Sequence, residues 1–218
     1  RPPRSTLLPY TTLFRSQYER FLERADDPSI RRQQLRFSYV LDVPIGRGHR
    51  VLGNIPRALD HVLGGWQFAG ITTMLTGARL SPTYSNADPA FTNQFSGRPD
   101  RIGNGNFDSG IMRDSIKNRI PIFDASAFAV PATGRGFYGN SARLVLTGPG
   151  QAVWNAGIHK NWSFADERAQ FQFRWELFNA FNRPNFNNPN LNIQSGAFGL
   201  VTTAGAGRTM LFGGRIDF

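Results

Sequence analysis

The sequence contains no cysteine, which excludes disulfide bridges, thiolate zinc sites and a cysteine nucleophile. Histidine is scarce too: His49, His61 and His159 are the only ones, and their spacing fits neither a metal site nor a catalytic triad. The glycine-rich stretches 46–50 and 103–110 do not follow a strand and open a helix, as phosphate-binding loops do, so we interpret them as turns. We therefore expect no enzymatic activity, no metal site and no cofactor.

Long apolar runs are also missing, and none approaches the roughly 18 residues that a membrane-spanning helix requires. Charged residues make up only 18% of the chain, whereas Phe occurs 19 times, Gly 23 times and Pro 14 times. This composition is more aromatic and less charged than that of an ordinary soluble domain. A membrane β-barrel remains compatible with it, because polar and apolar residues alternate along barrel strands and their hydropathies average out.

The formal net charge of +10 at pH 7 suggests nucleic acid as a partner, because clustered Lys and Arg bind phosphates. The basic residues are scattered, however, and the densest group, Arg31 and Arg32, lies in a short loop-like stretch. Neither a zinc-finger spacing nor an aromatic RNA-binding motif is present. We expect no nucleic-acid partner.

Alternation of apolar and polar residues with period two is the strongest pattern in the chain, and it is typical of strands with two different faces. It is clearest where Phe171, Phe173 and Trp175 alternate with polar residues. In segment 152–164, only Lys160 is a charged residue at an apolar position. The alternating segments are 34–43, 152–164, 169–181 and 207–218, and residues 65–79 are strand-like in composition with a blurred alternation.

The connections between these segments alternate in length. Residues 80–150 and 182–207 are long and rich in Gly, Asn and Pro, whereas 44–64 and 165–168 are shorter, and Pro56 near a first turn predicts a short helix over 55–63. Short periplasmic turns and long extracellular loops are the architecture of outer-membrane barrels. We therefore predict an all-β fold: an antiparallel, partial transmembrane β-barrel of about five strands with long extracellular loops.

In such a barrel the apolar strand faces contact lipid and the polar faces line a wet lumen. Arg174 and Glu176, two residues apart, are expected to form a structural charge network rather than a catalytic one. The tryptophans expected at the membrane interfaces are Trp66, Trp154, Trp162 and Trp175. The residues expected to face the lumen are Asn155, His159, Gln172, Arg174, Glu176 and Arg215. The pattern leaves open a soluble β-sandwich, in the form of a carbohydrate-binding or secreted structural domain.

Segments 64–82, 123–150, 154–164 and 171–190 resemble, in this order, the C-terminal barrel region of TonB-dependent receptors of the Gram-negative outer membrane. The closest subgroup is the Oar-like receptors, which have a carboxypeptidase-regulatory-like N-terminal domain. The resemblance implies a barrel of about 22 strands that is closed by a plug. It also implies uptake of an unidentified ligand, energised by the TonB complex. No plug, TonB box or signal peptide is found, so we expect residues 17–218 to be a C-terminal fragment of such a receptor.

The last residue, Phe218, ends an alternating apolar series, as in barrel proteins that the outer-membrane assembly machinery recognises by a terminal aromatic residue. The residues predicted to form this assembly signal are Met210, Phe212, Ile216 and Phe218. The resemblance therefore implies two further partners, the assembly machinery and outer-membrane lipid.

Residues 6–16, TLLPYTTLFRS, resemble the in-frame translation of a common short-read sequencing adapter, and only Leu8 differs. Pro9 and the threonines interrupt the apolar stretch, so it is not a signal peptide. We expect residues 1–16 to be a disordered artefact of sequence assembly.

Overall fold

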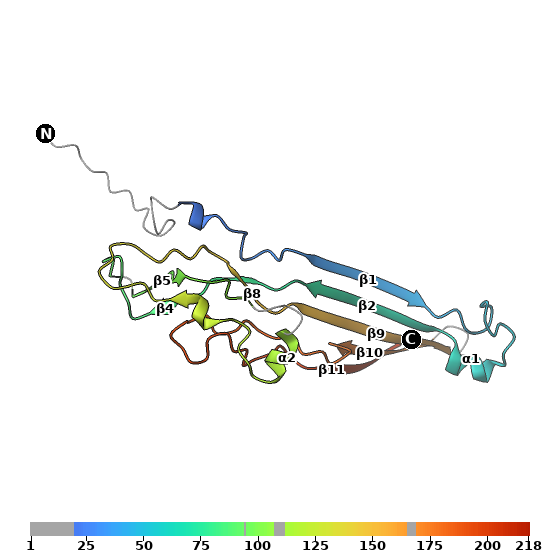
Figure 1. Cartoon of the computed structure of the whole chain (residues 1–218). Helices are drawn as coiled ribbons and strands as arrows, with labels where there is room; N and C mark the ends of the chain where they lie inside the picture. Colours follow the sequence, from blue (N-terminus) through green and yellow to red (C-terminus); the bar gives the residue numbers. More distant parts are fainter. Residues whose placement is uncertain (1–19, 94, 107–111, 165–168) are drawn as a thin grey trace. The chain divides into compact units, whose positions relative to one another are not determined.

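The computed structural model describes residues 20–93, 95–106, 112–164 and 169–218, and its contacts divide the chain into two compact units (Figure 1). The first unit comprises the residues up to Arg32 together with Gly77–Pro149 and Asn187–Thr203. The second comprises Gln33–Thr76, Gly150–Phe186 and Ala204–Phe218. The proposed artefact 1–16 and the predicted turn 165–168 lie outside the described residues.

The second unit is built on one five-stranded sheet in which every pair of neighbours is antiparallel (Figure 1). The order across the sheet is β1 (Gln34–Asp42), β2 (Trp66–Leu75), β9 (Gln151–Phe164), β10 (Ala169–Phe178) and β11 (Thr209–Asp217). All five predicted strands are confirmed, including the one with the blurred alternation. The sheet is not closed, and β1 and β11 form its edges.

The strand connections leave the sheet as the loop lengths predict. Leu75 of β2 pairs with Gln151 of β9, and Phe178 of β10 pairs with Thr209 of β11, so both long connections start and finish at the same end of the sheet. At the other end, the connection from β1 to β2 contains helix α1 (Arg57–Leu63), which follows Pro56. The predicted short helix is therefore confirmed.

The long connections, which make up most of the first unit, contain short paired strands and a helix. β3 (Arg79–Leu80) pairs with β8 (Leu146–Thr147), β4 (Tyr84–Ser85) with β5 (Ser96–Gly97), and β6 (Asp100–Arg101) with β7 (Phe128–Ala129). The other elements are the 3-10 helices η1 (Arg20–Glu23) and η2 (Ala125–Ala127) and the helix α2 (Met112–Lys117).

This first unit has a genuine apolar core. Tyr84, Ile122 and Leu146 are at most 1% exposed. The ring of Phe198 lies 6.2 Å from that of Phe123 and 6.1 Å from that of Phe128. Among the buried apolar residues of the described chain, all but Ala152 belong to this unit. The unit therefore buries its apolar side chains as a protein in water does.

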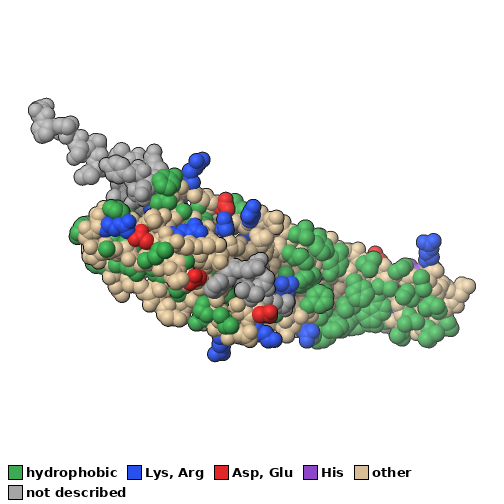
Figure 2. Space-filling view, viewed as in Figure 1, with side chains coloured by type: hydrophobic (Ala, Val, Ile, Leu, Met, Phe, Trp, Pro, Cys, Tyr) green, Lys and Arg blue, Asp and Glu red, His purple; other side chains and the backbone are tan. Residues whose placement is uncertain are grey.

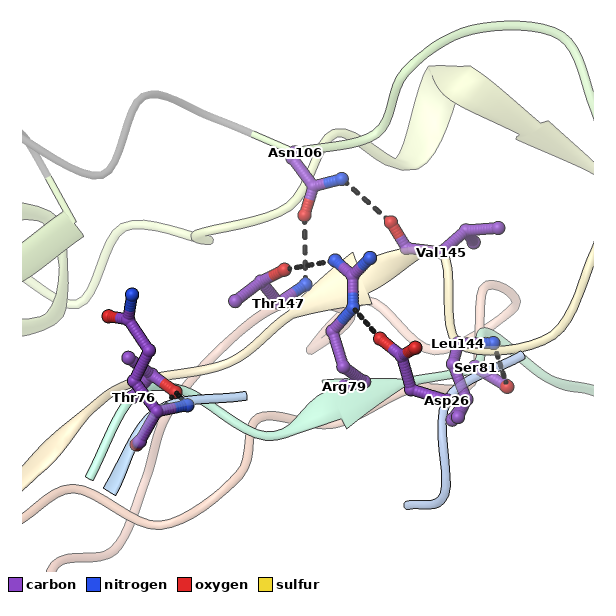
Figure 3. Close-up of polar contacts among 9 residues, drawn as sticks. Asp26, Thr76, Arg79, Ser81, Asn106, Leu144, Val145 and Thr147 are labelled. Atoms are coloured by element: carbon purple, nitrogen blue, oxygen red, sulfur yellow. Dashed lines mark hydrogen bonds and ion pairs between the residues drawn. The ribbon is translucent and has the colours of Figure 1, made fainter. Parts of the chain in front are cut away.

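Polar side chains also join distant segments within the first unit (Figure 3). The Asn106 amide donates to the Val145 carbonyl at 2.8 Å and accepts from the Thr147 amide at 2.9 Å. Arg79 donates to the Thr147 hydroxyl at 2.9 Å and lies 3.8 Å from the Asp26 carboxylate. Part-buried bonds between distant segments help to hold a loop-rich region in one conformation.

The helices are short. None in the described part of the chain is long and apolar enough to cross a membrane.

Candidate functional site

The strand register brings the apolar sets of all five strands onto one face of the sheet. Trp175 of β10 lies opposite Ile158 of β9 and Phe212 of β11, and Phe68 of β2 lies opposite both Ile158 and Leu41 of β1. We call this surface the apolar face. Its large members are Leu35, Phe37, Tyr39, Leu41, Trp66, Phe68, Met74, Trp154, Ile158, Trp162, Phe171, Phe173, Trp175, Leu177, Met210, Phe212 and Ile216.

Aromatic contacts across the strands support this register. The Trp175 ring stacks on Phe212 with centroids 5.6 Å apart, and Trp162 stacks on Phe171 at 5.3 Å. Aromatic pairs on directly opposed residues add to the stability of a sheet beyond the area that they bury. A slip by one residue would move every apolar side chain to the other face.

The apolar face remains exposed although it is rich in large side chains. Phe37 is 46% exposed, Phe212 62% and Ile216 64%. Figure 2 shows hydrophobic side chains gathered over the part of the molecule formed by the sheet. A contiguous exposed apolar surface marks contact with another apolar phase or partner.

Lys160 is the single cation of the apolar face and is only 1% exposed. Its ammonium group donates to the Gly64 carbonyl and lies over the rings of Trp66, at 5.5 Å, and Trp162, at 5.2 Å. A buried ammonium is tolerated when it has an acceptor and aromatic faces around it. Sequence reasoning identified Lys160 only as an exception to the alternation, because its partner lies 96 residues away.

Three of the four predicted interface tryptophans, Trp66, Trp154 and Trp162, lie towards the ends of their strands. The Trp66 indole donates to the Val62 carbonyl at 2.9 Å and that of Trp162 to the His61 carbonyl at 2.7 Å, which attaches the sheet to the α1 segment. Near the other end, Trp154 packs edge-on against Phe181 at 5.5 Å. Trp175, in contrast, lies opposite Ile158, near the middle of β9. A ring with one apolar and one hydrogen-bonding side suits an interface, and the interface position of the four stays a prediction.

The six residues predicted to face the lumen share the opposite face, which we call the polar face. Arg174 lies opposite His159, Glu176 opposite Gly157, and Arg215 opposite Gln172. Asn155 belongs to the same side, opposite Ile71.

Hydrogen bonds run along the polar face. The Arg174 Nε donates to Gln172 Oε1 at 2.6 Å, and the Gln172 amide donates to Asn161 at 3.0 Å. The Arg215 Nε donates to Asp217 at 2.8 Å. Arg174 donates to the neutral Gln172 side chain, and the role of Arg174 and Glu176 in a lumenal charge network stays a prediction. No group of three acidic or histidine side chains suited to a metal ion occurs in the described ranges.

The comparison with protein families agrees with this two-faced sheet. A model described as "Outer membrane beta barrel domain" matches residues 5–210. The chain belongs to this family. The outer membrane barrel domain is accordingly located in the bacterial outer membrane, and the soluble β-sandwich alternative is set aside. The match begins inside segment 1–16, whose origin stays a prediction. Neither the curated proteins nor the solved structures include a match to the chain.

Proposed function

We propose that this outer membrane barrel domain supplies five wall strands of a TonB-dependent receptor that takes up an unidentified ligand. The observation that carries the proposal is the apolar face: five strands in one register expose their apolar residues on one side and polar residues on the other. That division suits lipid on the outside and water on the inside. The resemblance of the ordered segments supports the Oar-like receptor subgroup.

The open edges of the sheet support a larger barrel. The outer edges of β1 and β11 pair with no further strand of the sheet. In hydrocarbon, unpaired N–H and C=O groups each cost several kcal/mol, so a spanning sheet must close on itself. In the proposed receptor, further strands pair with β1 and β11 and complete the wall.

The first unit has the properties of a water-exposed ligand-binding region in this proposal. It buries its own core, and the long connections that form most of it leave the sheet at one end. Loops on one side of a rigid scaffold are where binding residues concentrate. The proposed partners are lipid, the outer-membrane assembly machinery, the TonB complex and the transported ligand, and no catalytic step is proposed.

Genetic epistasis tests the uptake role even though the ligand is unidentified. Strains that lack the gene, lack the TonB energy transducer, or lack both are compared for growth on a panel of single nutrients. We expect a nutrient on which the gene deletion slows growth and on which the double deletion is no worse than loss of the transducer alone. A growth defect that is additive with loss of the transducer would contradict TonB-dependent uptake. The strain complemented with the intact gene is the control.

A further inference from the structure

Two neighbouring hollows on the polar face share Glu176 as a lining residue. The larger, about 360 Å³ in volume, crosses β1, β2, β9 and β10. The smaller, about 300 Å³, lies between β10 and β11. Glu176 borders both, and we call the two adjacent hollows together the groove.

Gly213 lines the smaller hollow and places no side chain in it. Gly213 lies directly opposite Arg174, and a Cβ atom added there would be 3.9 Å from the Arg174 Cβ, which is an ordinary contact. Arg215, two residues further along β11, lines the same hollow. The space is therefore bordered by two guanidinium groups on adjacent strands.

Both guanidinium groups retain donors for a ligand. The only hydrogen bonds of the Arg174 and Arg215 side chains within the described residues use their Nε atoms. Their Nη atoms are therefore available, and they present the planar donor geometry that carboxylate, sulfonate and phosphate groups accept in pairs. Asp217 pairs with Arg215 at 2.8 Å and Glu176 lines the same hollow, so the attraction for an anion comes from the unused Nη donors and not from a net positive charge.

The larger hollow is lined differently. Val40, Ile71 and Phe178 bring apolar side chains to a face that is mostly polar, and they are 67%, 49% and 46% exposed. His159 lies at its border, next to Gly157, where an added Cβ atom would come within 2.9 Å of the His159 Nε2. An apolar floor with a few polar groups at its margin is typical of small-molecule sites.

We propose that the groove binds an amphipathic organic anion, with its apolar body on Val40, Ile71 and Phe178 and its anionic group between Arg174 and Arg215. The inference rests on the proposed receptor function, in which the polar face lines the lumen. Glu176 lies between the two parts and accepts a hydrogen bond from a hydroxyl or ammonium group of the ligand. The net charge of +10 adds a general attraction for anions.

The absence of native cysteine allows a direct test, because Gly213→Cys introduces the only thiol of the chain. In outer-membrane fractions, its rate of modification is measured with an anionic sulfonatoethyl and a cationic trimethylammonioethyl methanethiosulfonate reagent. We expect the anionic reagent to react faster, and the preference to fall by roughly tenfold when Arg174→Gln and Arg215→Gln are added. Val153→Cys lies on the same face, opposite Thr73, lines neither hollow, and serves as the control without an anion preference.

Protection measures binding itself. Anilinonaphthalene sulfonate is expected to slow modification of the Gly213→Cys thiol, whereas its uncharged analogue phenylnaphthylamine is not. Adding Ile71→Asn should weaken this protection while the charge preference of the thiol is retained. Three results would each overturn the proposal. The thiol could show no charge preference, or the sulfonate could fail to protect it. It could also react with neither reagent because another protein segment fills the groove.

A second variant, Ile216→Cys, distinguishes an error in the proposed binding site from an error in the proposed barrel orientation. Ile216 lies on the apolar face, opposite Phe171, so in a membrane its thiol should react with neither charged reagent. A reactive thiol at position 216 contradicts the barrel orientation. If the thiol at position 216 does not react and the thiol at position 213 reacts equally with both reagents, the proposed binding site is wrong but the barrel orientation stands.

Discussion

Phe173→Arg is expected to reduce folded protein in the outer membrane severely, whereas Gln172→Arg is expected to be tolerated. Phe173 belongs to the apolar face, and its ring lies 6.4 Å from that of Phe212. A lipid-facing Arg costs roughly 2 to 4 kcal/mol near the bilayer midplane and less towards the interfaces. Lys160 lies directly opposite Phe173 and adds repulsion between like charges.

Heat-modifiable migration of both variants in outer-membrane fractions measures this difference. Gln172 is the matched control, because it neighbours Phe173 in the chain but lies on the polar face, where its amide donates to Asn161. Equal tolerance of the two arginines would show that the faces do not separate lipid from water.

Deletion of Phe218 is expected to prevent most of the protein from inserting into the outer membrane while its synthesis and export to the periplasm continue. Phe218 follows the end of β11 and is fully exposed, so its removal costs little packing within the sheet. Burial of a Phe side chain is worth at most roughly 1.5 to 3 kcal/mol. A nearly complete assembly defect would therefore indicate recognition of the chain end rather than lost stability.

The ratio of surface-exposed, folded protein to total protein is the measurement for this deletion. Phe218→Tyr preserves a terminal aromatic ring and should retain surface levels close to those of the unaltered protein. If the deletion variant also reaches those levels, Phe218 is only another apolar residue and not part of an assembly signal.

Strands with regular alternation could be predicted from sequence because each residue's face depends only on its position along the strand. The structure explains why the alternation of β2 is blurred. Gly70 and Thr72 of β2 lie on the apolar face, whereas Ala69 and Ile71 lie on the polar face. Tyr39 pairs with Gly70, and its ring occupies the space that a side chain at Gly70 would need. The apolar surface is therefore continuous even though the apolar set of β2 is not.

The core of the first unit could not be predicted in the same way. Tyr84, Phe123 and Phe198 come from segments far apart in the chain and follow no repeating period. The environment of Lys160 could not be predicted either, because only the strand register places Lys160 beside Trp66 and near Gly64. The groove also depends on register, since Gly213 matters only because it lies opposite Arg174. Contacts of this kind are set by tertiary structure, which local patterns do not encode.

Spin-label accessibility along β10 tests most directly whether the apolar face contacts lipid. Single cysteines at positions 171–176 are spin-labelled in the membrane-embedded protein, and collisions with lipid-soluble oxygen are compared with those of a water-soluble nickel complex. Labels at Phe171, Phe173 and Trp175 are predicted to collide mainly with oxygen, and labels at the three alternate positions mainly with nickel. Labels at Phe171, Phe173 and Trp175 that are shielded from both reagents would mean that protein covers this face, and would contradict the account.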